Sequence, residues 1–341
     1  MKEEMTMKSK LLSVILSAII LVVLTAGCSL GAPSDPPVRL LLMNEGWDSQ
    51  KFHNQLARFV VENGFDGYVV EEITGSTHLL WQALIDGDID LNTEMWPMNL
   101  ATYERDVAGG YVIELGIVVE ASVQGLYVPR FVVKGDPERG IEPMAPTLRT
   151  VEDLLRYPHV FRDPDRPARG RIYGSVPGWT ADEILYRMMS FHGLHESFNY
   201  FRPGSEAALF ASLESAYNFG EPWVGYSWEP SWVVGRFDLI LLEAAPYDPV
   251  LFAKGGTEIP GQALTVVSSS QFASRAPDLV DFFSRFRTGS QNVSNVLNHM
   301  RETRASPEEA AIWFLKNNDS LLDEWLTPEQ AYRVREALSR I

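Results

Sequence analysis

The 341-residue chain contains a single cysteine and only six histidines. One thiol cannot form an internal disulfide, so a disulfide-stapled fold is excluded. The histidines lack the spacing of metal ligands and lie at positions 53, 78, 159, 192, 195 and 299. The sequence also has no glycine fingerprint for a dinucleotide, no P-loop, no His-Glu-x-x-His helix and no Gly-x-Ser-x-Gly elbow. These absences predict no catalytic residue, no metal and no cofactor, and they favour a protein that is not an enzyme.

Positive charge is also scarce. The 29 Lys and Arg residues are outnumbered by 45 Asp and Glu residues, which gives a formal net charge of -16. A surface of this sign repels phosphate backbones, so we expect no nucleic-acid partner. Hydrophobic residues at 45% and charged residues at 22% are typical of a folded globular protein. The length exceeds the roughly 100 to 200 residues of an ordinary domain and predicts two lobes.

Only one long apolar run is present, at residues 11–24, and it follows a basic start at Lys2, Lys8 and Lys10. The run is shorter than the roughly 20 residues that span a bilayer as a helix. It is typical of the apolar core of a signal peptide. Residues 1–27 are therefore predicted to be a cleaved signal peptide.

The segment Leu24-Thr25-Ala26-Gly27-Cys28 is similar to a bacterial lipobox, whose cysteine becomes N-terminal and lipid-modified. We expect Cys28 to carry a lipid anchor and residues 28–37, which are rich in Pro and Gly, to form a flexible tether. This predicts an extracytoplasmic protein attached to a bacterial membrane, at the cell surface or in the periplasm. The alternative is a free thiol beside an uncleaved N-terminal helix.

From residue 38 onward, strand and helix signals alternate. Apolar runs predict strands at 38–43, 67–73 and 89–93, and helical periodicity predicts helices at 48–64 and 76–85. This order indicates a mostly parallel sheet with helices on its faces. Ligands of such sheets collect beyond the carboxyl ends of the strands.

The rest of the chain continues the same pattern. Further strands are expected at 111–120, 126–133, 171–176, 223–228 and 239–242, the last being the final core strand. Gly125 and Pro129 are expected to mark a bend between lobes. Helices are expected to open at Thr150, at Thr180 with a capping box to Glu183, and at 206–217. Capping spacing also starts two C-terminal helices, at Ser306 with Glu309 and at Thr327 with Gln330.

The positions of the nine tryptophans carry the functional prediction. Trp81, Trp313 and Trp325 lie in predicted helices, where packing explains them. The other six lie in Gly- and Pro-containing segments near strand ends: Trp47, Trp96, Trp179, Trp223, Trp228 and Trp232. Rings at the carboxyl ends of strands should converge on the ligand crevice, together with Tyr127. Whether Trp223 and Trp232 join this cluster or pack in the core stays open.

An aromatic box without acids or metal ligands suits a quaternary ammonium group. Its methyl groups need apolar contact, and its charge is attracted by ring faces with roughly 0.5 to 2 kcal/mol per ring. A neutral amino acid would require acceptors for its ammonium group and usually an arginine. The competing interpretation is that these aromatics simply form the core.

The same residues carry a resemblance to the substrate-binding proteins of ABC importers for glycine betaine, choline and proline betaine. The resemblance covers residues from about 38 to the C-terminus. It rests on these segments in this order: Gly46-Trp47-Asp48, Glu94-Met95-Trp96-Pro97, residues 125–129, Pro177-Gly178-Trp179, residues 222–230, residues 308–316 and residues 323–326. Each segment is weakly specific alone, and the order makes the set fairly specific.

The resemblance implies an α/β, two-lobed periplasmic-binding-protein-like fold of type II with the ligand in the interlobe cleft. Residues 38–125 plus 242–341 would form lobe 1, and residues 126–241 would form lobe 2. It implies an aromatic cage, and the candidates for it are Trp47, Trp96, Tyr127 and Trp228. Trp179 stands where the second lobe supplies polar or aromatic contacts, and Asp48 is the nearer acid. The expected partners are a permease and an ATPase, with the binding protein a monomer.

The sequence departs from the choline-binding pattern at two positions. Ser49 and Trp179 stand where choline-binding members tend to have an Asp and an Asn, which favours a betaine over choline. The betaine carboxylate could be held by backbone N–H groups between Gly178 and Thr180, at a helix start where the dipole favours an anion. Arg130 is a second candidate partner.

Two other functions stay open. A surface lipoprotein could be a hydrolase, or it could bind carbohydrate on tryptophan platforms. Sugars also require many Asp, Asn, Arg and Gln side chains around their hydroxyls, and the tryptophan-bearing segments are comparatively poor in these residues.

Overall fold

The computed structural model describes residues 36–341, so the predicted signal peptide at 1–27, the anchor at Cys28 and most of the tether lie outside the described residues. The chain divides into two units, Met1–Pro37 and Val38–Ile341. The second unit is described here. Within residues 36–341, no helix combines the length and apolar character needed to cross a membrane.

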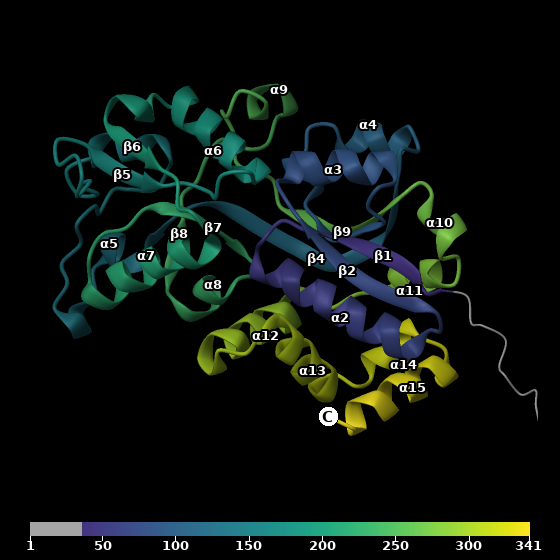
Figure 1. Ribbon diagram of the computed structural model, residues 1–341. Coiled ribbons are helices and arrows are strands. Elements are labelled where there is room, and N and C mark those ends of the chain that lie inside the picture. The colour runs from purple at the N-terminus through teal and green to yellow at the C-terminus, as the bar shows by residue number, and fades with distance from the viewer. Residues whose placement is uncertain (1–35) are drawn as a thin grey trace, which may run out of the picture. The chain divides into compact units, whose positions relative to one another are not determined.

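The strands of this unit form one sheet, in the order β2-β1-β3-β9-β4-β7-β5-β6, with β8 paired to β4 (Figure 1). The outer pairs β1·β2, β1·β3, β5·β6 and β5·β7 are parallel, and the pairs made by β4 and β9 are antiparallel. The strand bounds are β1 Val38–Asn44, β2 Tyr68–Thr74, β3 Leu91–Met95, β4 Val112–Pro129, β5 Gly170–Tyr173, β6 Phe198–Phe201, β7 Gly225–Glu229, β8 Leu239–Leu241 and β9 Gln262–Ser269. The predicted α/β class is therefore confirmed.

Helices flank the sheet. In Figure 1, α3 and α4 lie above the part built on β1, β2 and β3, and α2 lies below it with the C-terminal helices. The bounds are α2 Asp48–Gly64, α3 Thr77–Asp86, α4 Tyr103–Ala108, α5 Arg130–Lys134, α6 Thr180–Phe191, α7 Glu206–Phe219, α8 Trp232–Arg236, α9 Pro249–Phe252, α10 Phe272–Arg275, α11 Leu279–Arg285, α12 Ser290–Thr303, α13 Pro307–Asn317, α14 Leu321–Trp325 and α15 Pro328–Ser339.

Helix α2 is stabilised by burial of the same apolar face that predicts the helix. Phe52, Leu56 and Val60 recur on one face and are fully buried, and the helix contacts β2 and β3 as well as α13 and α15. The capping boxes predicted at Ser306 and Thr327 are both present at the starts of α13 and α15. The C-terminal helices therefore follow local sequence signals, and they complete the core beneath α2.

Strand β4 joins two halves of the sheet. Its residues up to Ser122 pair with β9, and its residues from Val123 pair with β7 and β8. We call β2, β1, β3, β9 and the start of β4 the first half, and the end of β4 with β7, β8, β5 and β6 the second half. The prediction of two strands with a bend at Gly125 is wrong, because β4 runs unbroken to Pro129.

The reason for Gly125 is packing. A Cβ added there would lie 2.7 Å from Cδ1 of Leu241 on β8, so a larger residue would require the Leu241 side chain to move. Beyond Pro129 the chain turns into α5, where the sequence analysis extends the strand to residue 133. The helix predicted from Thr150 is a short 3-10 turn at Glu152–Arg156.

Strand β9 is absent from the predictions, which end the core strands at residue 242. It nevertheless lies between β3 and β4 in the centre of the sheet. Its end is rich in serine, which is typical of a loop, although Ser268 and Ser269 are both buried. Their backbones pair with β3 and β4, so the sheet overrides the local signal.

Candidate functional site

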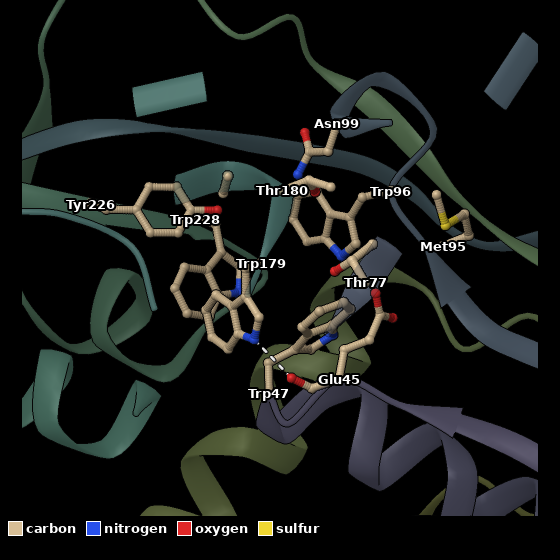
Figure 2. A pocket seen from close by; sticks show the side chains of 11 residues that line it. Glu45, Trp47, Thr77, Met95, Trp96, Asn99, Trp179, Thr180, Tyr226 and Trp228 are labelled. Carbon is tan, nitrogen blue, oxygen red and sulfur yellow. Dashed lines mark hydrogen bonds between the residues drawn. The ribbon is translucent and has the colours of Figure 1, made fainter. Parts of the chain in front are cut away.

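A cavity of about 30 Å³ lies where the two halves meet, beyond the carboxyl ends of β1 and β3 (Figure 2). Side chains from both halves enclose it. The lining residues are Glu45, Trp47, Thr77, Met95, Trp96, Asn99, Trp179, Thr180, Ala181, Tyr226 and Trp228. The structure therefore brings together five residues predicted for the site, namely Trp47, Trp96, Trp179, Thr180 and Trp228.

Two of the tryptophans are positioned by the same local device. Trp47 follows Gly46 and Trp179 follows Gly178, and both glycines have positive φ angles, 99° and 96°. Each tryptophan then takes an extended conformation at the N-cap of a helix, α2 or α6. The turn at glycine directs the chain, and the N-cap residue projects its ring into the cavity (Figure 2).

The capping box predicted between Thr180 and Glu183 is therefore wrong. Helix α2 also lacks a side-chain cap, because Trp47 occupies its N-cap position, and the hydroxyl of Ser49 donates to Glu94 Oε1 at 2.8 Å. Helix α6 begins at Thr180 with no capping box to Glu183, because Trp179 occupies the N-cap position. At both helix starts, a tryptophan that lines the cavity stands at the N-cap in place of a residue whose side chain could cap the helix.

The rings of the two halves touch each other. The ring centres of Trp47 and Trp179 lie 5.4 Å apart with an interplanar angle of 90°. Trp179 in turn meets Trp228 at 5.6 Å and 83°. Both contacts are edge-to-face, a favourable geometry for aromatic pairs. The tryptophans thus close on one another and leave only a small central space.

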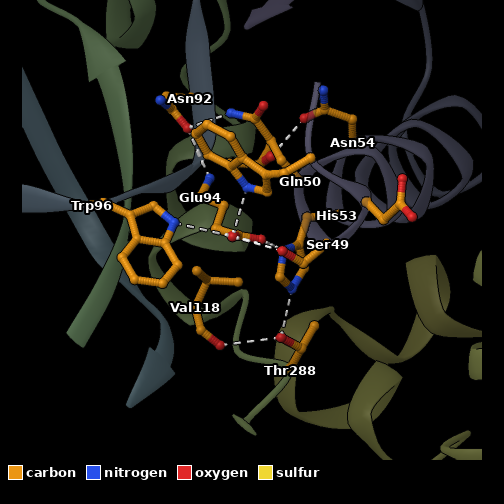
Figure 3. A network of polar contacts seen from close by, with 12 residues as sticks. Ser49, Gln50, His53, Asn54, Asn92, Glu94, Trp96, Val118 and Thr288 are labelled. Atoms are coloured by element: carbon orange, nitrogen blue, oxygen red, sulfur yellow. Dashed lines mark hydrogen bonds and ion pairs between the residues drawn. The ribbon is translucent and has the colours of Figure 1, made fainter. Parts of the chain in front are cut away.

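Behind the first-half rings lies the fully buried carboxylate of Glu94 (Figure 3). Its Oε1 accepts hydrogen bonds from Nε1 of Trp47 at 2.8 Å and from Nε1 of Trp96 at 3.3 Å. The hydroxyl of Ser49 donates to the same oxygen. Because an indole N–H can only donate, Glu94 holds both rings by their edges.

The second oxygen of Glu94 is also occupied. Nδ1 of the buried His53, on α2, lies 2.6 Å from Glu94 Oε2. Nε2 of His53 lies 2.8 Å from Oγ1 of Thr288, whose hydroxyl donates to the carbonyl of Val118 at 3.2 Å. These hydrogen bonds thus connect Glu94, which holds the two tryptophans, to α2, β4 and the segment before α12 (Figure 3).

Glu45 is a second buried carboxyl group, and this one faces the cavity. Its Oε2 accepts from Nε2 of Gln50 at 2.7 Å and from Nδ2 of Asn92 at 3.3 Å. Its Oε1 is buried without a hydrogen-bond partner among residues 36–341. Burial raises the pKa of Glu45 to about 7. Near neutral pH, this group can therefore exist in either protonation state.

The second-half wall is built from packed rings. Trp228 lies 4.8 Å from Phe210 of α7 and 5.2 Å from Tyr226, measured between ring centres. The Tyr226 hydroxyl donates to Oε1 of Gln124 at 2.8 Å. Burial raises the pKa of Tyr226, so its hydroxyl stays protonated at neutral pH.

Hydrogen bonds link the halves around the cavity. Nε1 of Trp179 donates to the carbonyl of Glu45 at 2.7 Å. The backbone N–H of Thr77, at the start of α3, donates to the carbonyl of Gly178 at 3.1 Å. The backbone N–H of Asp48 donates to Oε2 of Glu206 at 2.8 Å. Burial and the neighbouring Asp48 raise the pKa of Glu206.

Several predicted residues lie outside the cavity lining. Tyr127 is buried in β4 opposite Gly225, and its hydroxyl has no partner within residues 36–341. The Asp48 carboxylate pairs with Lys51 at 3.0 Å. Gly178 contributes its backbone to the contact between the halves. Arg130 pairs with Asp238 at the surface.

The two undecided tryptophans also lie outside the cavity lining. Trp223 stacks on Tyr173 at 5.7 Å and donates from Nε1 to the hydroxyl of Ser212. Trp232 packs against Phe210 at 5.7 Å, and the Arg301 guanidinium lies over its ring. Both therefore pack in the second half rather than around the cavity.

Four polar lining residues are not among the predicted site residues: Glu45, Thr77, Asn99 and Tyr226. Tyr226 could have been predicted from the sequence, because it stands two residues before Trp228 in a strand and therefore lies on the same face. Glu45 directly follows the predicted first strand, next to Trp47. Thr77 and Asn99 have no such signal.

The chemistry of the lining is that of a binding site. Ring faces dominate it, and its polar groups are one carboxyl group, hydroxyls and an amide. Within residues 36–341, no group of three or more His, Cys, Asp or Glu side chains could hold a metal ion. The lining contains no Lys, Arg or His side chain. Such a site favours a ligand with a positive, apolar group.

Residues 38–317 match the family of the substrate-binding domain of the ABC-type glycine betaine transport system. The chain belongs to this family. The resemblance to betaine- and choline-binding transport proteins is thus confirmed. The protein is a substrate-binding component of a betaine/choline ABC transporter family. Among curated proteins, none matches this sequence.

Solved structures confirm the type II periplasmic-binding-protein-like fold. The glycine/betaine/L-proline-binding protein from Borrelia burgdorferi is similar with a TM-score of 0.69 at 19% identity, over 87% of this chain and 99% of that one. An ABC-transporter choline-binding protein in complex with choline has a TM-score of 0.68 at 19% identity, over 88% and 98%. Lactococcal OpuAC, closed with glycine betaine, has a TM-score of 0.65 at 19% identity, over 85% and 99%.

Proposed function

We propose that this protein captures a quaternary ammonium compound, glycine betaine or a related betaine, between the aromatic walls of the cavity. The observation that carries the proposal is that Trp47, Trp96, Trp179 and Trp228 line one space whose lining has no basic side chain. A permanently methylated cation needs ring faces rather than hydrogen-bond acceptors. The family to which the chain belongs supports this ligand class.

The start of α6 supplies a place for the carboxylate of a betaine. The first N–H groups of a helix have no partner within the helix, and their dipole favours an anion. Thr180 and Ala181 are the first residues of α6, and both line the cavity. Choline has a hydroxyl instead, for which the unpartnered Oε1 of Glu45 is the suitable acceptor.

The cavity must open to admit such a ligand. Both halves line this space of about 30 Å³, and the rings of Trp47 and Trp179 are in contact, so the halves must separate before a ligand can enter between the rings. We propose that residues 38–125 plus 242–341 and residues 126–241 are two lobes that rotate about the connections near the end of β4 and after β8. The closed form would then be recognised by the permease of the importer, with its ATPase.

Isothermal titration calorimetry of residues 38–341 tests the function. Glycine betaine, choline, carnitine, proline and maltose form the ligand panel. We expect saturable binding of a quaternary ammonium compound and no binding of maltose. Binding of maltose alone would favour the carbohydrate alternative, and hydrolysis of generic esters or glycosides would favour an enzyme.

We also propose that the protein is anchored to a bacterial membrane through a lipid on Cys28, after cleavage of residues 1–27. The lipobox-like segment Leu24-Thr25-Ala26-Gly27-Cys28 supports this. Cell fractionation of Cys28→Ser tests it, and we expect release from the membrane fraction. A variant that stays with the membrane would contradict the lipid anchor.

A further inference from the structure

Glu94 lies outside the cavity lining but controls two of its rings. Its Oε1 accepts both indole N–H groups of the first-half wall, from Trp47 and Trp96. The carboxylate is fully buried, so water does not compete for these hydrogen bonds. The rings therefore have a single shared anchor, and the anchor is a side chain that can carry a negative charge.

We infer that Glu94 is a positioning residue that sets the orientation of Trp47 and Trp96 and makes the site selective for cationic ligands. This rests on the proposed capture of a quaternary ammonium compound. Glu94 would then help to determine the affinity for the ligand without touching the ligand.

The geometry gives Glu94 two separable effects. The first is positional, because Glu94 holds each indole by the N–H at its edge. The second is electrostatic. A hydrogen bond to an ionised acceptor is stronger than one to a neutral acceptor, and it leaves the negative charge close to the ring edges. A cation over those rings then gains attraction from both the ring faces and the carboxylate.

Replacement by glutamine separates the two effects. The amide oxygen of Glu94→Gln can accept from Trp47, Trp96 and Ser49 as Oε1 does. Its NH2 group, opposite Nδ1 of His53, can donate to that nitrogen while Nε2 donates to Thr288. Every hydrogen-bond partner is thus kept, the bond to His53 reverses its direction, and the acid is lost. Glu94→Ala removes both the acid and the anchor.

The chain contains a matched control. Asp106 is a buried carboxylate whose Oδ2 accepts Nε1 of Trp81 at 2.9 Å, the same kind of bond. Neither residue lines the cavity. Asp106→Asn therefore disturbs an indole–carboxylate pair without touching the proposed site.

The experiment measures binding of glycine betaine and choline by calorimetry and the near-ultraviolet circular dichroism of each ligand-free variant. For Glu94→Gln we expect the wild-type spectrum and an affinity for the bound cation lowered about tenfold, the scale of one strong cation–π contact. For Glu94→Ala we expect a changed tryptophan spectrum and a larger loss. Asp106→Asn should bind as the wild type does.

Two results would overturn the inference. One is a Glu94→Gln variant that binds the cation as tightly as the wild type, and the other is a Glu94→Ala variant with an unchanged spectrum and affinity. A wild-type protein that binds neither cation would instead refute the proposed function, and with it the selectivity for cations. The spectrum of Glu94→Ala would still test whether Glu94 positions the rings.

Discussion

The two halves of the sheet bring aromatic rings to the same cavity but hold them by different forces. In the first half, Trp47 and Trp96 are tethered through their N–H groups to one buried carboxylate, Glu94. In the second half, Trp228 is held by ring packing against Phe210 and Tyr226. Hydrogen bonds fix direction, whereas apolar packing fixes volume and tolerates small rotations.

This difference suits a site that closes on its ligand. A tethered wall presents its ring faces in one orientation before the ligand arrives. A packed wall can adjust to the ligand because no ring in it depends on a single bond. Trp179 lies between them, since its ring meets Trp47 and Trp228 and its N–H donates to Glu45 across the gap.

Truncation of the packed wall should have the largest effect. Phe210 is 1% exposed, and Phe210→Ala should lower the free energy of unfolding by about 3 to 5 kcal/mol through lost burial and the cavity left behind. Urea denaturation measures this change. Phe219→Ala at the exposed end of the same helix is the control, with an expected change within about 0.5 kcal/mol. Equal losses in both variants would contradict the packing account.

The carboxyl group of Glu45 should make stability depend on pH. Its folded pKa of about 7 exceeds the ordinary value of 4.5, so the folded state holds the proton more tightly than the unfolded state. The stabilisation is fully present below pH 4.5 and is lost as pH rises through about 7. The total loss is on the order of 3 kcal/mol.

Urea denaturation of the wild type and Glu45→Gln between pH 4 and pH 8 checks this prediction. The wild type should lose stability relative to the variant as pH rises. The same relative stability at both ends of the range would show that Glu45 titrates as it does in the unfolded chain.

Removal of one tethered ring should weaken binding of the ligand. Trp96→Ala should lower the affinity for glycine betaine by about 0.5 to 2 kcal/mol, the contribution of one ring. Tryptophan fluorescence titration measures it. Trp313→Ala is the control, because Trp313 stacks on His299 and does not line the cavity. An unchanged affinity for Trp96→Ala would remove Trp96 from the cage.

The smallest effect is expected at Arg130. Its side chain is about half exposed and pairs with Asp238, away from the cavity lining. Arg130→Ala should change betaine affinity by less than about 0.5 kcal/mol, as for most surface substitutions. A loss of binding by calorimetry would mean that Arg130, and not the start of α6, holds the carboxylate.

The sequence predicted much of the first half, because its signals are local. Helical periodicity and apolar runs place α2, α3 and the first strands close to their observed bounds. Tryptophans after Gly46 and Gly178 also carry a local signal, since glycine at a strand end marks a turn and the following residue begins a helix. Six tryptophans were chosen because they lie in Gly- and Pro-containing segments near strand ends, and four of them line one cavity.

The features that the sequence did not predict depend on neighbours in space. Strand β9 is a strand because β3 and β4 lie on either side of it. Gly125 reads as a bend, yet it is the contact point for β8. Tyr127 pairs with Gly225 and Tyr226 pairs with Leu126, so the register between β4 and β7 places the two tyrosine side chains on opposite faces of the sheet. Glu94 directly precedes Met95 and Trp96, and nothing in that order shows that its carboxylate also accepts the indole of Trp47.

A crystal structure of residues 38–341 with glycine betaine tests the central claim most directly. The account predicts that the ammonium nitrogen lies within about 6 Å of tryptophan ring centres from both walls, with the carboxylate at the start of α6. A ligand bound elsewhere, or one that contacts the rings of one half only, would contradict it.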